Sequence, residues 1–374
     1  MTLRLSIASY PRRVRLSTSA LALAALLVAP MSSCSHASPP PVAPPSPPRD
    51  DGPKTPETLF PPSVDFDIVN LFIDDQFVYW AHRGEKGLVK VPLTGGPPVT
   101  LVPGSEQPVT SLAADASFLY FTTGRRIDTE ASDMLLGRKS PRAGHFEGVV
   151  ARLEKKPGAQ VQEISSGRFK PEDVAIDATN VYWIMARKDE TLVRQAIGQI
   201  DLPEVVAHGD FLPGSLTIAG GFAYWIDTGK GPAVMRVPTK GGEPERLGGA
   251  QPLHPVRLAA DDGAVYLTDA GPMEGKGSVV RIALGTGQGA AGSVLVAENL
   301  DTPRAVAVRA GTVYWLTKGT SAKNYLDGAL EKAPAGGGPK ITMATGLAAP
   351  DRLAVSDTRV AWTEATGAVK DLAR

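Results

Sequence analysis

Cysteine is almost absent from this chain of 374 residues: Cys34 is its one copy, so no internal disulfide can form. Aromatic residues make up 6% of the sequence, and the 3.6-residue periodicity of amphipathic helices is missing almost throughout. The first absence means that stability must come from packing. The missing helical periodicity excludes helical bundles and helical repeats.

The sequence also lacks the signatures of several enzyme classes. Its five histidines never show His-x-x-x-His spacing, and no Gly-x-Ser-x-Gly motif occurs. The Gly-rich stretch 285–292 separates two strand-like runs and does not open a helix, as a phosphate-binding loop would. Residues 34–374 hold 35 basic and 39 acidic residues, a net charge of −4, with no dense Lys/Arg patch. We therefore expect no cofactor and no nucleic-acid partner.

The N-terminus has the pattern of an export signal. Residues 1–33 carry four arginines, no acidic residue and an apolar run, Ala20–Ala29, that is too short to span a bilayer. The run leads into Met31-Ser-Ser-Cys34, which resembles a lipobox, the bacterial signal for lipidation of its cysteine. We expect lipidated Cys34 at the membrane, in the periplasm or at the cell surface. The alternative is plain secretion after cleavage behind Ala37. Residues 34–57 are proline-rich and predict an extended tether.

A repeat fills the remaining sequence. Its pattern is an apolar pair, a turn residue, a few polar residues, then an apolar residue, Tyr and Trp, as in Ala175–Trp183. All five tryptophans of the chain and six of its eight tyrosines fall at these two positions. The Tyr positions are 79, 120, 182, 224, 266, 314 and 361, the last occupied by Ala. A proline precedes each of the last six by 11 or 12 residues.

These spacings predict the fold class. Successive Tyr positions lie 41, 62, 42, 42, 48 and 47 residues apart, and roughly 40–50 residues per repeat is typical of a four-stranded propeller blade. One blade reads as strands at Ser215–Ala219, Phe222–Ile226, Ala233–Pro238 and about Pro244–Leu247, with a Gly-Gly hairpin turn before the last. We expect residues 58–374 to form an all-β propeller of seven blades, each with four antiparallel strands.

The seventh repeat ends one strand short. Its strands are expected near Leu353–Val355, Val360–Glu364 and Ala368–Leu372, and the chain stops at Arg374. An open blade would leave an unpaired edge. The segment Thr58–Phe66 is the remaining one able to supply the fourth strand, and we expect it to close the ring.

The Tyr-Trp pair with an Asp two residues later, as in Tyr224-Trp-Ile-Asp227, resembles the YWTD propeller motif, and Tyr266-Leu-Thr-Asp269 is a weaker copy. The chain also resembles the NHL- and TolB-like propellers of bacterial envelopes. YWTD propellers usually have six blades, whereas seven copies occur here. The resemblance implies the architecture and says little about activity.

Loops at one face and the channel mouth are the candidate binding surface. Three loops are long: Thr122–Gly148, Ala270–Ser278 and Lys318–Gly328. The candidate residues come from the first loop and from positions beside the repeat prolines: Arg125, Arg126, Asp133, Glu172, Asp173, Arg257, Arg304, Asp351 and Arg352. Related propeller enzymes bind a divalent metal with carboxylates at this mouth. Here arginines interleave with the carboxylates, which favours ion pairs and no metal.

We therefore interpret the chain as a non-enzymatic, monomeric binding or scaffolding propeller for an envelope protein, peptide or glycan, with membrane contact only through its lipid anchor. The alternative is a metal-dependent hydrolase or lyase acting at the channel. Three or four carboxylate or Asn oxygens converging at the mouth would favour the enzyme, and Arg–carboxylate pairs would favour the binding protein.

Overall fold

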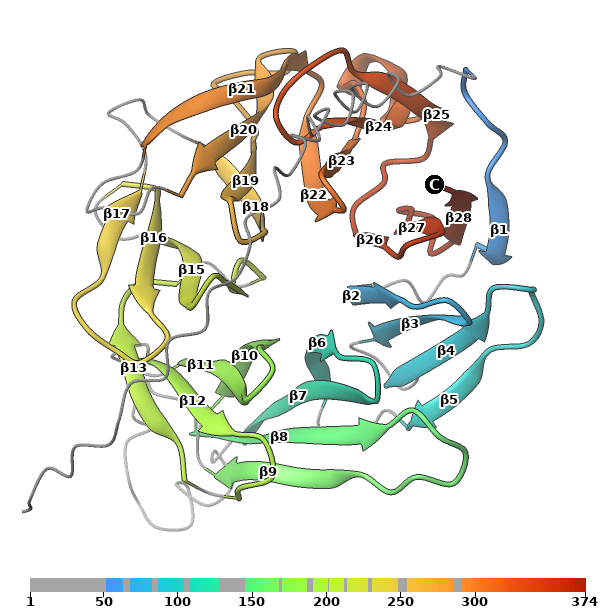
Figure 1. The fold of residues 1–374 in the computed structure, drawn as a ribbon. Coiled ribbons are helices and arrows are strands. Elements are labelled where there is room, and N and C mark those ends of the chain that lie inside the picture. The colour runs from blue at the N-terminus through green and yellow to red at the C-terminus, as the bar shows by residue number, and fades with distance from the viewer. Residues whose placement is uncertain are drawn as a thin grey trace, which may run out of the picture. The chain divides into compact units, whose positions relative to one another are not determined.

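The computed structural model describes residues 52–374 apart from 63–67, 83–86, 104–107, 128–144, 168–169, 187–190, 201, 212–213, 228–230, 248–253 and 285–290. Within these residues, 28 strands form seven antiparallel sheets of four strands each. The sheets stand around a ring with β2, β6, β10, β18, β22 and β26 toward its centre (Figure 1). The predicted fold class, blade number and strand number are confirmed.

The strands of blades 1 to 3 are β2 (Ile68–Ile73), β3 (Phe77–His82), β4 (Leu88–Pro92), β5 (Val99–Val102), β6 (Val109–Ala114), β7 (Phe118–Ile127), β8 (His145–Glu154), β9 (Gln162–Gly167), β10 (Lys170–Ile176), β11 (Asn180–Ala186), β12 (Thr191–Ala196) and β13 (Glu204–His208). Those of blades 4 and 5 are β14 (Thr217–Ala219), β15 (Phe222–Asp227), β16 (Ala233–Pro238), β17 (Glu245–Leu247), β18 (Pro255–Ala260), β19 (Ala264–Asp269), β20 (Gly277–Ala283) and β21 (Ala291–Leu300). Those of blades 6 and 7 are β22 (Pro303–Arg309), β23 (Thr312–Thr317), β24 (Gly328–Pro334), β25 (Ile341–Leu347), β26 (Leu353–Val355), β27 (Arg359–Thr363), β28 (Val369–Ala373) and β1 (Glu57–Phe60).

Each blade runs from its inner strand outward through hairpins. We call the face where the second strand leads into the third, and the fourth into the next blade, the upper face. The hairpins between first and second strands and between third and fourth strands lie on the lower face. The predicted Gly-Gly turns occur in the latter hairpins, as at Gly241-Gly242, where φ values of 92° and 143° suit glycine.

The residues at the Tyr and Trp positions of the repeat bind each blade to its two neighbours. Adjacent residues of a strand point to opposite faces of the sheet, so Tyr faces the following blade and Trp the preceding one. Tyr182 of blade 3 accordingly shares a buried cluster with Trp225 of blade 4, and Tyr314 of blade 6 shares one with Trp362 of blade 7. Seven such clusters of buried residues fill the seven gaps between blades. The repeated aromatic residues are therefore the core of the ring.

An aspartate five residues before the Tyr fixes the turn between the first two strands in several blades. Asp177 accepts hydrogen bonds from the backbone N–H groups of Thr179 (2.7 Å) and Asn180 (2.7 Å), and its second oxygen accepts the Tyr182 hydroxyl at 2.6 Å. Asp115 and Asp261 repeat this arrangement in blades 2 and 5. The same side chain thus shapes a lower-face turn and holds the Tyr.

The ring is closed by the N-terminal strand, as predicted. β1 pairs antiparallel with β28 and completes the sheet β26-β27-β28-β1. Its Leu59 is buried, and the Phe60 ring lies 5.4 Å from that of Trp80 in blade 1. Phe60 fills space at the one repeat where Ala361 stands in place of Tyr. The strand is shorter than expected and ends before Pro61 and Pro62, so these prolines interrupt no ladder.

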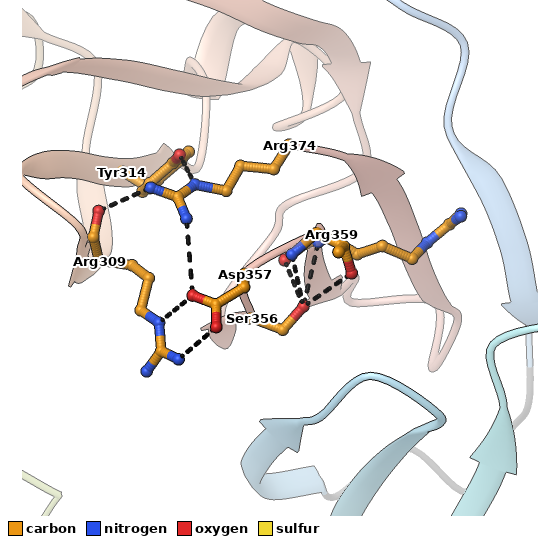
Figure 2. Close-up of polar contacts among 7 residues, drawn as sticks. Arg309, Tyr314, Ser356, Asp357, Arg359 and Arg374 are labelled. Carbon is orange, nitrogen blue, oxygen red and sulfur yellow. Dashed lines mark hydrogen bonds and ion pairs between the residues drawn. The ribbon is translucent and has the colours of Figure 1, made fainter.

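A second set of contacts, on the lower face, joins blade 7 to blade 6 (Figure 2). Arg374 donates to the Tyr314 hydroxyl at 2.5 Å and to the Arg309 carbonyl at 2.8 Å. Arg309 in turn forms two hydrogen bonds, of 2.8 and 3.0 Å, with the carboxylate of Asp357. The last residue of blade 7 is therefore bound to blade 6.

The segment expected as one long loop, Thr122–Gly148, begins and ends in paired strands, and residues 128–144 lie outside the described residues. β7 continues to Ile127 and β8 begins at His145, and ten residue pairs join them. The sequence prediction was wrong here because the apolar alternation stops near Phe121 while backbone pairing continues with polar residues. The one helix among the described residues is the 3-10 turn Ser321–Lys323, and none there is long and apolar enough to cross a membrane.

Candidate functional site at the upper channel mouth

The inner strands carry equivalent residues nine positions before the repeat Tyr. In several blades this residue is short and polar and bonds the next blade. Asn70 donates to the Leu112 carbonyl at 3.0 Å, and the Ser111 hydroxyl accepts the Val174 N–H at 3.2 Å. Five inner strands show a register shift here: β2, β6, β10, β18 and β22. Such bulges redirect side chains and are frequent beside functional sites.

Asp173 occupies this position in blade 3. Its buried carboxylate accepts the backbone N–H groups of Gly214 (2.7 Å), Ser215 (3.1 Å) and Leu216 (3.4 Å) in blade 4. Burial raises its pKa to about 6, and these three donors oppose the rise. Asp173 is therefore a link between blades. Among the described residues it does not form the expected ion pair, and its oxygens accept backbone N–H groups of blade 4 instead.

Asp351 is the carboxylate that the arginines share. Arg304 donates to Asp351 Oδ1 from Nε (3.0 Å) and Nη2 (2.8 Å), and Arg352 Nη1 lies 3.2 Å from Oδ2. Burial alone would raise the pKa of Asp351, but the guanidinium groups of Arg352, Arg304 and Arg257 hold it below its usual value. The predicted Arg–carboxylate pairing is confirmed for this group.

Arg257 lies in the same cluster without a carboxylate partner. It forms no ion pair within the described part of the chain, and Nη1 donates to the carbonyl of its neighbour Val256 at 2.9 Å. Its guanidinium packs on the backbone of Gly214, where a Cβ would come within 3.6 Å of Cζ. Burial, followed by the nearby charge of Arg352, lowers its pKa to about 10. We call Asp173, Arg257, Arg304, Asp351 and Arg352 the mouth cluster.

The other predicted residues do not join the mouth cluster. Glu172 pairs with Lys170, with 2.5 Å between Oε1 and Nζ. Arg125 and Arg126 lie on the extended end of β7, at the upper face, and Asp133 falls outside the described residues. The paired ends of β7 and β8 extend blade 2 at the upper face.

Two upper-face loops stand beside the mouth cluster. Residues 270–276 and 318–327 are joined by a hydrogen bond from the Ser321 N–H to Glu274 (3.0 Å). The Ala349 N–H donates to the Tyr325 carbonyl at 2.7 Å, next to Pro350 and Asp351. A hollow of about 220 Å³ beside the 349–351 segment is lined by Lys318 of the second loop and by Arg304, Asp351 and Glu364, among others. These loops carry two of the most exposed apolar side chains among the described residues, Met273 (65%) and Leu326 (61%).

The lower mouth of the channel differs from the upper one because carboxylates outnumber cations in its lining. A hollow of about 590 Å³ there is lined by Asp74, Asp115, Asp357, Lys155 and Arg309, among others. Its carboxylates shape turns or form ion pairs: Asp74 Oδ2 lies 3.1 Å from the Lys155 ammonium, and Asp357 binds Arg309. Among the described residues, no group of three or more His, Cys, Asp or Glu side chains is placed to hold a metal ion. The arginine-rich upper mouth is therefore the stronger candidate site.

No protein-family profile and no curated protein sequence matches this chain. Solved structures do. An inactive H270A variant of virginiamycin B lyase from Staphylococcus aureus, with quinupristin, has a TM-score of 0.56 at 12% identity over 86% of this chain and 98% of that one. YCF48 bound to D1 peptide has a TM-score of 0.56 at 13% identity, over 87% and 97%. This chain shares their propeller fold. At such identities the likeness shows the fold alone.

Position relative to the repeat would have revealed the mouth cluster more fully. Aligned on the Tyr, Arg257 and Arg352 replace the short polar residues that link blades elsewhere. A second signal that was missed lies across the sheet, where each repeat Tyr faces a Lys or Arg of the third strand, as Tyr182 faces Arg194. These cations lie across from the Tyr residues within the blades and do not belong to the mouth cluster.

Proposed function

We propose that this chain is an exported, non-enzymatic propeller that binds a protein or peptide through its upper face. The observation that carries the proposal is that the carboxylates at the mouth already make hydrogen bonds or ion pairs within the protein. Asp173 is held by three backbone donors, Asp351 by two arginines and Glu172 by Lys170. Metal-assisted hydrolysis or elimination needs carboxylate oxygens directed at one open point. Because these three carboxylates are already bound to other groups of the protein, we favour a binding function over metal-assisted catalysis.

The exposed side chains favour a polypeptide partner over a glycan. Sugar-binding sites commonly stack an aromatic ring on the face of the sugar. In the described part of the chain the strongly exposed large apolar residues are aliphatic or Met, and the repeated Tyr and Trp side chains are buried between blades. Met273 and Leu326 on the upper loops can instead contact apolar side chains of a protein.

Export and lipidation rest on residues outside the described part of the chain. We propose that Cys34 carries the lipid and that the proline-rich segment holds the ring away from the membrane. The sequence motifs in residues 1–57 support this placement.

Site-specific photo-crosslinking in the native cell tests the proposed face. A crosslinking amino acid replaces Leu326 on the upper face or Ile200 in a lower-face turn, which are 61% and 63% exposed. We expect a discrete protein adduct from position 326 and none from position 200. Adducts from both positions, from 200 alone or from neither would contradict the proposal. Metal analysis addresses the enzyme alternative, since one tightly held calcium or zinc ion per chain would favour it.

A further inference from the structure

We infer that Arg257 and Arg352 form a receptor for one carboxylate of the partner polypeptide, positioned by the Arg304–Asp351 pair. This inference rests on the proposed function and names the chemical group that the upper face recognises. The ligand is a carboxylate from either an acidic side chain or the chain's C-terminus.

The first support is the departure from the repeat. The seven equivalent positions of the inner strands hold Asn70, Ser111, Asp173, Ser215, Arg257, Ala305 and Arg352. The three short side chains in blades 1 to 3 bond the backbone of the next blade. Neither arginine makes such a bond within the described residues: Arg257 donates to its own neighbour, and Arg352 contacts Asp351 beside it. At these two places, therefore, arginine does not form the backbone link between blades that the short residues form.

The second support is a set of hydrogen-bond donors without acceptors. A guanidinium carries five N–H donors. Arg257 uses one of its nitrogens, Nη1, in a hydrogen bond within the described part of the chain, which leaves Nε and Nη2. Arg352 Nε is buried and has no hydrogen-bond partner there. Buried polar groups are normally satisfied, so Arg352 Nε–H is a donor at the mouth that a ligand's acceptor can satisfy.

The third support is charge. The mouth cluster contains three guanidinium groups and two carboxylates, so its net charge is about +1 at neutral pH, above the pKa of Asp173 at about 6. Burial, and after it the positive charge of Arg352, lowers the pKa of Arg257. One carboxylate would neutralise the cluster.

The fourth support is what surrounds the cluster. Tyr325 binds the strand-linking segment at Ala349, next to Asp351, and the same loop exposes Leu326. Arg304 and Lys318 line one hollow beside this segment. The Lys318 ammonium lies 3.9 Å from the centre of the Tyr325 ring and forms no ion pair within the described residues. An apolar contact next to unmatched cations fits a peptide that presents a carboxylate near an apolar side chain.

Labelled octapeptides of Gly, Ala and Leu provide the probe, with fluorescence anisotropy as the readout. One peptide has a free C-terminal carboxylate, one is amidated, and one is amidated but carries two Glu. For the purified chain we expect the better of the two carboxylate peptides to bind at least ~10-fold more tightly than the neutral amide. The ratio between the two carboxylate peptides identifies the source of the group.

The double variant Arg257→Gln/Arg352→Gln should reduce this preference to within ~2-fold. Arg309→Gln, on the lower face, is the matched control and should retain it. Competition on the wild-type chain needs no variant: benzoate should displace the carboxylate peptide, and benzamide should not. If the double variant does not fold, this competition decides.

Equal affinity for all three peptides, or no binding by any at millimolar concentration, would overturn the inference. Stronger competition by inorganic phosphate than by benzoate would also overturn it and favour a phosphorylated ligand. A partner adduct at position 326 without carboxylate preference would refute this inference and leave the proposed function standing. Absence of both would refute both.

Discussion

Removing the closing contacts of β1 should destabilise the whole ring. The perturbation is Leu59→Ala combined with Phe60→Ala, which leaves the chain length and the strand backbone intact. Leu59 is 6% exposed in the cluster between blades 7 and 1, and Phe60 packs on Trp80. Neither residue contributes a side chain to the mouth cluster, so the effect on stability is separable from binding.

The magnitude follows from these contacts. A buried Leu→Ala change costs ~2–5 kcal/mol through lost apolar burial and the cavity left behind. Loss of the aromatic pair with Trp80 adds ~0.5–1.5 kcal/mol. We therefore expect the double variant to lose about 3–6 kcal/mol of unfolding free energy, a large part of the ~5–15 kcal/mol typical of a domain.

Urea unfolding followed by tryptophan fluorescence measures this loss, because all five tryptophans are buried between blades. The control is Val99→Ala on β5, the outermost strand of blade 1, where Val99 is 46% exposed. It should change the unfolding free energy by less than about 0.5 kcal/mol. If the double variant unfolds within that margin of the control, the reasoning about ring closure is refuted.

Three further predictions concern single residues. Tyr182→Phe should lower the unfolding free energy, measured with denaturant, by about 1–2 kcal/mol because it removes the hydrogen bond to Asp177. The control is Tyr224→Phe, because the buried Tyr224 hydroxyl has no hydrogen-bond partner among the described residues. It should change the unfolding free energy by about 0.5 kcal/mol or less. For Asp173, the raised pKa of about 6 means that the folded chain keeps a proton that the unfolded chain, with a pKa of 3.8, has lost. Stability from this group therefore falls as pH rises from 3.8 to 6, and Asp173→Asn should gain up to ~3 kcal/mol relative to wild type between pH 4 and 7; an unchanged difference would refute this. Cys34→Ala should move the chain from the membrane to the soluble fraction, and equal partitioning of both forms would contradict lipidation.

The sequence was sufficient for the architecture because the pattern that reveals the blades also builds them. Tyr and Trp on adjacent positions must face opposite sides of a strand, and each therefore marks an interface between blades, as Tyr182 and Trp225 show. The missing fourth strand of blade 7 could be inferred from the same count.

The pairing at the mouth could not be inferred in full. Asp173 and Gly214 are 41 residues apart in sequence, and their contact lies at a bulge in β10. The residue types in β10 do not predict that bulge. Spacing placed the arginines at the channel. It could not show that Asp351 pairs with Arg304 and Arg352, while Arg257 forms no ion pair among the described residues. The length of the β7–β8 pairing could not be predicted from the sequence either, because its outer residue pairs are polar and are joined by backbone hydrogen bonds.

Arginine side-chain NMR tests the central claim most directly. The Nε–H signals of Arg257 and Arg352, assigned through their Gln variants, are followed while benzoate or benzamide is added to the purified chain. Both signals should shift with benzoate and remain in place with benzamide, because a carboxylate supplies the acceptor that these donors lack. Arg236, whose Nε already donates to Glu245 at 2.6 Å, should not respond. Unmoved signals at Arg257 and Arg352, or equal shifts with benzamide, would contradict a carboxylate receptor at the channel mouth.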